Sequence, residues 1–134
     1  MSAVVRTRMN LGLHHLLAAC RFAGTIREIE ERHVDDIFSD FWNEILQNAL
    51  GVVALSVAAL ESYANDLYFE GSILKNSLSP EAAQKIAKLI DKESILNKFD
   101  TALAIKTGKQ LKHHSEIVQN ISTLIKLRNA VVHF

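Results

Sequence analysis

Hydrophobic residues recur along most of the chain with the spacing of an α-helix, and no stretch shows the strict alternation that is typical of a β-strand. The first predicted helix runs from about Leu11 to His33, and we expect its apolar stripe, including the thiol of Cys20, to be buried. The stripe consists of Leu13, Leu16, Leu17, Cys20, Ala23 and Ile26.

A second, longer helix is predicted to start at Asp35 and Asp36, because acidic side chains favour a helix N-terminus, and to reach about Phe69. It is apolar on nearly all sides, which is typical of a helix at the centre of a bundle or of a dimer interface. We expect Gly71 to end this helix and a loop to follow as far as Leu78.

Three shorter helices complete the pattern. Ser79-Pro80-Glu81 is a strong start signal, with a capping residue, proline at the first helical position and an acid in the first turn. A fourth helix is predicted from about Glu93 to Ile105, ended by Gly108, and a fifth begins near Ser115-Glu116. The sequence therefore predicts an all-α, single-domain bundle of about five helices with a long central helix, and the domain spans residues 1–134.

Composition narrows the class of protein. The chain has 134 residues, 49% of them hydrophobic, which suits one folded domain and excludes intrinsic disorder. A single cysteine, Cys20, allows no internal disulfide, so we expect a cytoplasmic, reducing environment. The longest apolar run, Ala49 to Leu60, is shorter than the roughly 20 residues that span a bilayer, so no membrane partner is expected.

The charges are unevenly distributed, although 15 Lys plus Arg balance 15 Asp plus Glu. Residues 35–74 contain seven acids and no Lys or Arg, whereas residues 75–134 contain ten basic residues and five acids. A neutral chain can thus present one acidic and one basic surface, so net charge alone does not exclude a nucleic-acid partner.

One basic residue in the last helix occupies an apolar position. Ile117, Ile121, Leu124 and Arg128 form a single stripe at helical spacing. Burying a guanidinium is costly unless it is paired, so Arg128 either pairs with an acid at the helix end, extends to solvent, or belongs to a functional site. His133 lies about 140° away around a regular helix, so the two residues share a site only if the helix ends or bends near Asn129 or a second copy contributes.

Arg128-Asn129, three further residues and His133 resemble the Arg-polar-x(3–5)-His signature of HEPN domains. The stretch 59–68 resembles the long helix that precedes this signature in bacterial members, and the resemblance covers roughly residues 35–134, leaving the first 34 as an N-terminal helix. Family members usually continue beyond the histidine, whereas here only Phe134 follows.

The resemblance implies a helical domain that acts as a homodimer and cleaves RNA without a metal or other cofactor, as bacterial toxins and anti-phage proteins of this family do. It implies that His133 is the general acid/base, that Arg128 holds the scissile phosphate and that Asn129 orients one of these groups. It also implies a possible antitoxin partner. Glu61 is a second charge on an apolar face, and it either supports Arg128, in the same subunit or the other, or is simply solvated.

Other features give weaker predictions. The stretch containing Lys106, Lys109, Lys112 and His113 either follows an RNA backbone or is a solvated charged face. The two adjacent histidine pairs lack the i, i+4 spacing of metal ligands, and the scattered glycines form no phosphate-binding loop, so no metal and no cofactor are expected. The alternative to a ribonuclease is a catalytically silent helical module in which Arg128 and His133 only stabilise a dimer interface.

Overall fold

The computed structural model describes residues 10–68 and 77–133, and within these two ranges it contains five α-helices and no strand. The all-α prediction is thus confirmed. The helices are α1 (Leu11–Arg32), α2 (Phe41–Asp66), α3 (Pro80–Ile90), α4 (Ile95–Thr107) and α5 (Glu116–Val132).

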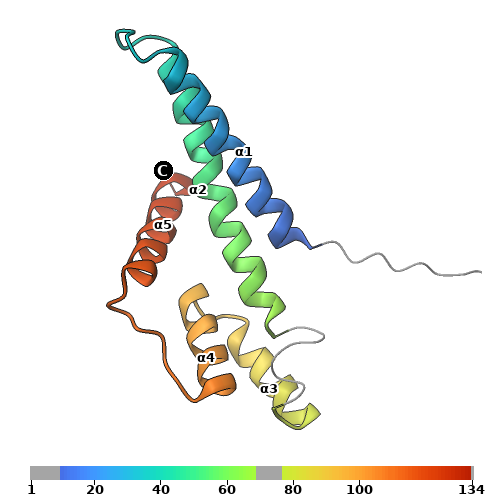
Figure 1. The fold of residues 1–134 in the computed structure, drawn as a ribbon. Coiled ribbons are helices and arrows are strands. Elements are labelled where there is room, and N and C mark those ends of the chain that lie inside the picture. Colours follow the sequence, from blue (N-terminus) through green and yellow to red (C-terminus); the bar gives the residue numbers. More distant parts are fainter. Residues whose placement is uncertain (1–9, 69–76, 134) are drawn as a thin grey trace, which may run out of the picture.

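Helices α1 and α2 form a long antiparallel hairpin that extends beyond the rest of the molecule (Figure 1). Small residues let the two helices approach closely. A Cβ atom at Gly12 would lie 3.3 Å from Ser62 and Tyr63, and one at Gly51 would lie 3.0 Å from the ring of Phe22. The hairpin is therefore held by close backbone contact as well as by buried side chains.

The face of α1 that packs on α2 differs from the predicted one. Gly12, Ala19 and Ile29 are the buried residues of α1, whereas Leu13 and Leu17 of the predicted stripe are exposed. Cys20 is also exposed, so the prediction of a buried thiol is wrong. The apolar spacing predicted the helix correctly, but a stripe of leucines is no guide to the packed face when the partner helix requires small residues.

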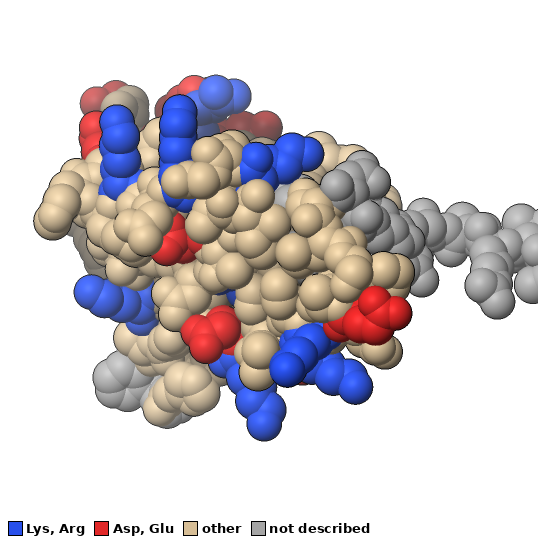
Figure 2. Space-filling view, turned by 90° about the horizontal axis from the view of Figure 1, so that it is seen from below, with Lys and Arg blue, Asp and Glu red and all other residues tan. Residues whose placement is uncertain are grey.

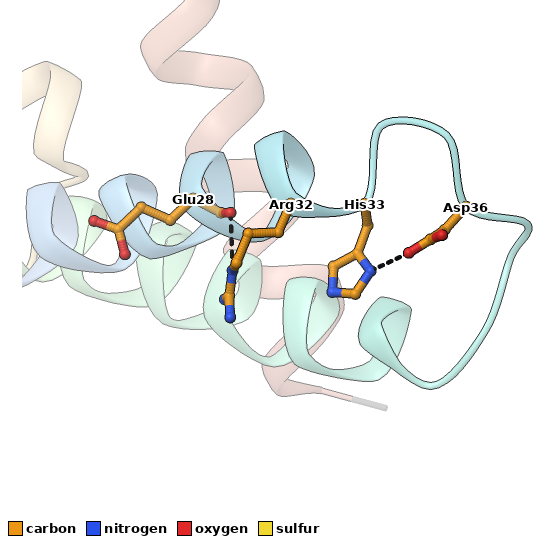
Figure 3. A network of polar contacts seen from close by, with 4 residues as sticks. All are labelled: Glu28, Arg32, His33 and Asp36. Atoms are coloured by element: carbon orange, nitrogen blue, oxygen red, sulfur yellow. Dashed lines mark hydrogen bonds and ion pairs between the residues drawn. The ribbon is translucent and has the colours of Figure 1, made fainter.

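The turn between the two helices is ordered by polar and aromatic contacts (Figure 3). The Nδ1 atom of His33 lies 2.5 Å from Oδ2 of Asp36, and the His33 ring stacks on Phe41 with ring centroids 4.4 Å apart. The Nε of Arg32 donates a hydrogen bond to the backbone oxygen of Glu28, one turn earlier in α1. Asp36 thus binds His33, the C-cap of α1, and α2 begins at Phe41 instead of at the two predicted aspartates.

The shorter helices begin and end largely as predicted. Ser79 accepts a hydrogen bond from the amide of Ala82 at the start of α3, and Ser94 caps α4 in the same way through Asn97. Gly108 ends α4 with a φ of 69°, a conformation that favours glycine. Helix α2 ends at Asp66. The predicted end near Phe69, Gly71 and most of the loop to Leu78 lie outside the described residues.

The core is small and lies at one end of the hairpin. Helices α4 and α5 both pack on the C-terminal half of α2, where Val57, Ala64 and Ile95 form one buried cluster and Tyr68, Ile90 and Ala102 form another. The N-terminal half of α2 contacts α1 but extends past these helices, so much of its surface is exposed (Figure 1).

Helix α2 is long and apolar enough to cross a membrane on length and composition alone. The apolar run Ala49 to Leu60 is part of this 26-residue helix. The length of the run is therefore no argument against a membrane-spanning helix. What argues for packing in a bundle is that α1, α4 and α5 all contact this helix.

Candidate functional site

Helix α5 carries the candidate motif at its C-terminal end, close to the middle of α2 (Figure 1). Leu124 and Ile125 pack against the cluster around Val57 and Ala64, and Arg128 follows one turn later on the same side. Arg128 therefore continues the side of α5 that packs on α2.

Arg128 is half-buried, and its Nε atom is buried without a hydrogen-bond partner in the part of the chain that the structure describes. A buried donor of this kind costs roughly 1–3 kcal/mol when it stays unpaired. Packing of α5 thus places a donor where no residue in the described ranges satisfies it.

His133 forms the C-cap of α5, and its backbone N–H donates to the oxygen of Asn129 at 3.2 Å. Its side chain is exposed, as is that of Asn129. Because α5 continues as a regular helix to Val132, Arg128 and His133 project about 140° apart. The helix neither ends nor bends near Asn129, so of the two arrangements that would join these residues, only a second copy of the chain remains.

Glu61 is exposed on α2, and no ion pair joins it to Arg128 within residues 10–68 and 77–133. The ion pairs found there are Arg27–Glu31 and His33–Asp36, both on the α1–α2 hairpin. Support of Arg128 by Glu61 of the same chain is not seen, and support across a dimer stays a prediction.

The basic stretch lies at the opposite end of α5 from the motif. Lys106 is near the end of α4, and Lys109, Lys112 and His113 are exposed in the connection to α5. With 17 residues at 1.5 Å each, α5 separates this stretch from the motif by about 25 Å. The basic stretch and the motif thus do not lie together in one chain, although an RNA several nucleotides long could contact both.

Exposed apolar side chains on two helices were not identified from the sequence as part of a site. Large exposed hydrophobic side chains lie on the N-terminal half of α2 and at the end of α5, and we call this the central patch: Trp42, Leu46, Leu50, Leu127, Val131 and Val132. The sequence indicated this surface only through the apolar residues on nearly all sides of α2, which are as typical of a dimer interface as of a bundle core. Across the described ranges, no three His, Cys, Asp or Glu side chains gather in a way that would hold a metal ion.

Comparison with known proteins adds no identification. No protein-family model, no curated protein and no solved structure matches the chain. The class that fold and site define is therefore an all-α bundle with an Arg-Asn-x3-His motif at the end of its last helix.

Proposed function

We propose that the protein is a metal-independent endoribonuclease of the HEPN type that acts as a homodimer. The observation that carries the proposal is the Nε of Arg128, a buried donor without a partner in the described chain, located five residues before an exposed histidine at the helix end. A phosphate would accept from the terminal nitrogens of the same guanidinium, and charge-assisted hydrogen bonds from arginine to phosphate are among the strong ones in proteins.

The proposed reaction needs only the chain's own side chains. The RNA 2′-oxygen attacks the adjacent phosphorus, the bond from phosphorus to the 5′-oxygen breaks, and the products are a 2′,3′-cyclic phosphate and a 5′-hydroxyl. His133 accepts the proton of the 2′-hydroxyl, and a second His133, from the other copy, donates a proton to the leaving oxygen. Imidazole suits both tasks because it gains and loses a proton near neutral pH.

Arg128 would stabilise the negative charge that develops on the phosphate during attack, which is usually the largest contribution to catalysis of this kind. Asn129 is exposed next to it on α5 and would orient the phosphate or the histidine. Glu61 would hold the guanidinium of the other subunit, and the basic stretch around Lys109 would contact the RNA backbone.

Dimerisation is supported by the central patch. Its residues are apolar and exposed in the single chain, and three of them, Leu127, Val131 and Val132, lie within or beside the motif in the sequence. Monomeric proteins seldom leave large apolar areas uncovered. Burying this patch against a second copy would bring two motifs close to one two-fold axis, because a C2 interface uses the same surface on both subunits.

The test is RNA cleavage by the purified protein in EDTA. We expect cleavage that is lost in His133→Ala and in Arg128→Ala, with 2′,3′-cyclic phosphate ends on the products. His14→Ala is the matched control, because His14 is an exposed histidine near the start of α1. Full activity of His133→Ala would refute the assigned roles, and activity that requires a divalent cation would refute the metal-independent mechanism.

A catalytically silent dimerisation module is the second candidate, and the extent of the central patch is the observation that favours it. In that case Arg128 contributes to the interface alone. A dimeric parent protein without ribonuclease activity, together with an Arg128→Ala variant that no longer dimerises, would establish the module.

The cellular setting follows from the proposed activity. A ribonuclease of this kind is harmful to its own cell, so we infer a role as a toxin or phage-defence component in the cytoplasm, controlled by an antitoxin protein. Co-expression provides the check: growth arrest on induction of the parent, and none on induction of His133→Ala, is expected.

A further inference from the structure

The turn between α1 and α2 exposes an unusual amount of apolar surface. We call residues 33–40 the hairpin tip, and within it Val34, Ile37 and Phe38 are 78%, 89% and 76% exposed. These side chains are presented on an ordered turn, because Phe38 stacks on Trp42 with ring centroids 5.1 Å apart and Asp36 is bound to His33. The hairpin tip is thus a preformed apolar projection.

The tip is also acidic. Asp35, Asp36 and Asp40 lie within the same eight residues, which contain no Lys or Arg. A surface that covers Ile37 and Phe38 should therefore be apolar at its centre and basic at its edge.

The opposite end of the molecule has such a surface. A groove of about 430 Å³ lies between α2, α4 and α5, and we call it the basal groove. Its lining is apolar apart from Lys106, and includes Leu60, Leu96, Phe99, Leu103 and Ile117. Ile117 is 73% exposed at its edge, so an apolar segment arriving from outside would cover it.

The connection between α4 and α5 forms part of the groove wall and carries basic side chains. The backbone N–H of Leu111 donates to Oδ1 of Asp100 at 2.5 Å, which ties the connection between α4 and α5 to α4 and keeps Leu111 in the groove wall. Lys109 and Lys112 flank that leucine in the sequence and are exposed. Viewed from this end of the molecule, Lys and Arg side chains lie at the rim of a mostly uncharged area, with Asp and Glu side chains among them (Figure 2).

We propose that the hairpin tip of one protomer seats in the basal groove of a second copy, and reciprocally. Ile37 and Phe38 would enter the groove, whose volume is in the range that encloses a small apolar ligand, and the three aspartates would face Lys106, Lys109 and Lys112. This contact depends on the hairpin tip and the basal groove alone, and not on ribonuclease activity.

The geometry of α2 allows the reciprocal arrangement. The tip adjoins Phe41 at one end of α2, and the groove is lined by Leu60 and Leu67 near the other end. If two α2 helices lie antiparallel with the two-fold axis near Val53, each tip falls beside the other copy's groove, about 18 Å from the axis at 1.5 Å per residue. The end of α5 lies near the same level of α2, so this axis would also bring the two motifs together (Figure 1).

Cysteine crosslinking tests the contact directly. In a Cys20→Ser background, a chain with Phe38→Cys is mixed with a chain that carries Ile117→Cys and treated with a short bis-maleimide. We expect a crosslinked heterodimer from this pair. Leu89→Cys replaces Ile117→Cys in the control, because Leu89 is 67% exposed on α3 and does not line the groove.

Crosslinking of position 38 to position 89 with equal yield, or of two chains through position 38 alone, would overturn the proposal. So would a protein that is monomeric at micromolar concentration in sedimentation equilibrium. In the same experiment, Phe38→Asp should raise the dimer dissociation constant at least tenfold, whereas Leu89→Asp should leave it unchanged.

Ribonuclease activity is measured separately, so the two proposals fail in different ways. Crosslinking between positions 38 and 117 in a protein without ribonuclease activity would support the tip–groove contact and refute the enzyme. A Phe38→Asp variant that stays dimeric and cleaves RNA would refute the contact and leave the enzyme intact.

Discussion

Replacing Arg128 by Met separates a role in folding from a role in function. The two side chains have similar length and similar helix propensity, so the substitution mainly removes the guanidinium from the apolar stripe of α5. An unpaired buried polar group costs about 1–3 kcal/mol, and the lower figure applies because Arg128 is half-buried and, of its guanidinium, only Nε is a buried atom without a partner in the described chain. We therefore expect Arg128→Met to raise the free energy of unfolding by about 1 kcal/mol and to abolish RNA cleavage.

Urea denaturation measures the first effect. With a slope of about 2 kcal/mol/M, a gain of this size moves the midpoint upward by roughly 0.5 M. Lys126→Met is the matched control, because Lys126 is exposed on the same helix and its loss should change stability by less than about 0.5 kcal/mol. The midpoint should be recorded at two protein concentrations, since the proposed dimerisation would make it concentration-dependent.

A fall in stability would refute this reasoning. If Arg128→Met lowered the free energy of unfolding by about 2 kcal/mol or more, the guanidinium would have a structural partner that the single chain does not show. Concentration-dependent destabilisation would locate that partner in the second subunit and favour the interaction module over the enzyme.

Three further predictions concern the fold. Lys98 is 5% exposed, and its Nζ donates a hydrogen bond to Oδ1 of Asn65 at 2.7 Å. Asn65→Leu leaves the buried ammonium with fewer acceptors, so it should lower the free energy of unfolding, measured by urea denaturation, by about 2–3 kcal/mol. Lys98→Met, which removes the ammonium, should lower it by less. Burial raises the pKa of Tyr68 above its ordinary 10.0, and a backbone hydrogen bond opposes this shift in part. The folded state therefore favours the neutral phenol, so the free energy of unfolding should fall as the pH rises above about 10. In Tyr68→Phe this fall should be less steep. Gly108→Ala should lower the melting temperature because φ is 69° there, whereas Gly24→Ala, inside α1 with open space around it, should raise it, each by an amount corresponding to about 1 kcal/mol.

The sequence was sufficient for the secondary structure because capping residues and helical spacing act locally. Ser79 and Gly108 begin and end helices where their chemistry predicts. The start of α2 was predicted too early, because the side chain of Asp36 binds His33 at the end of α1 and does not begin α2.

Packed faces were harder to predict, because they depend on the partner helix. The leucines of α1 predicted a buried stripe, yet the contact with α2 runs through Gly12 and Ala19. Buried Lys98 was not identified either, since nothing in its sequence neighbourhood shows that Asn65, 33 residues earlier, would accept its hydrogen bond. The position of Arg128 on an apolar stripe was predictable because it depends on the spacing within one helix.

Three features of the single chain have the same physical consequence. The apolar sides of α2 are covered only in part, the acidic hairpin tip and the apolar basal groove with its Lys106 lie at opposite ends of one molecule, and Arg128 and His133 project from different sides of α5. Each is unfavourable or incomplete in a monomer, because apolar surface stays in water, complementary charges stay apart and a phosphate bound at Arg128 is not reached by the histidine of the same helix. One antiparallel arrangement of two α2 helices would resolve all three at once, and this convergence is a stronger argument for a two-fold dimer than any of the features alone.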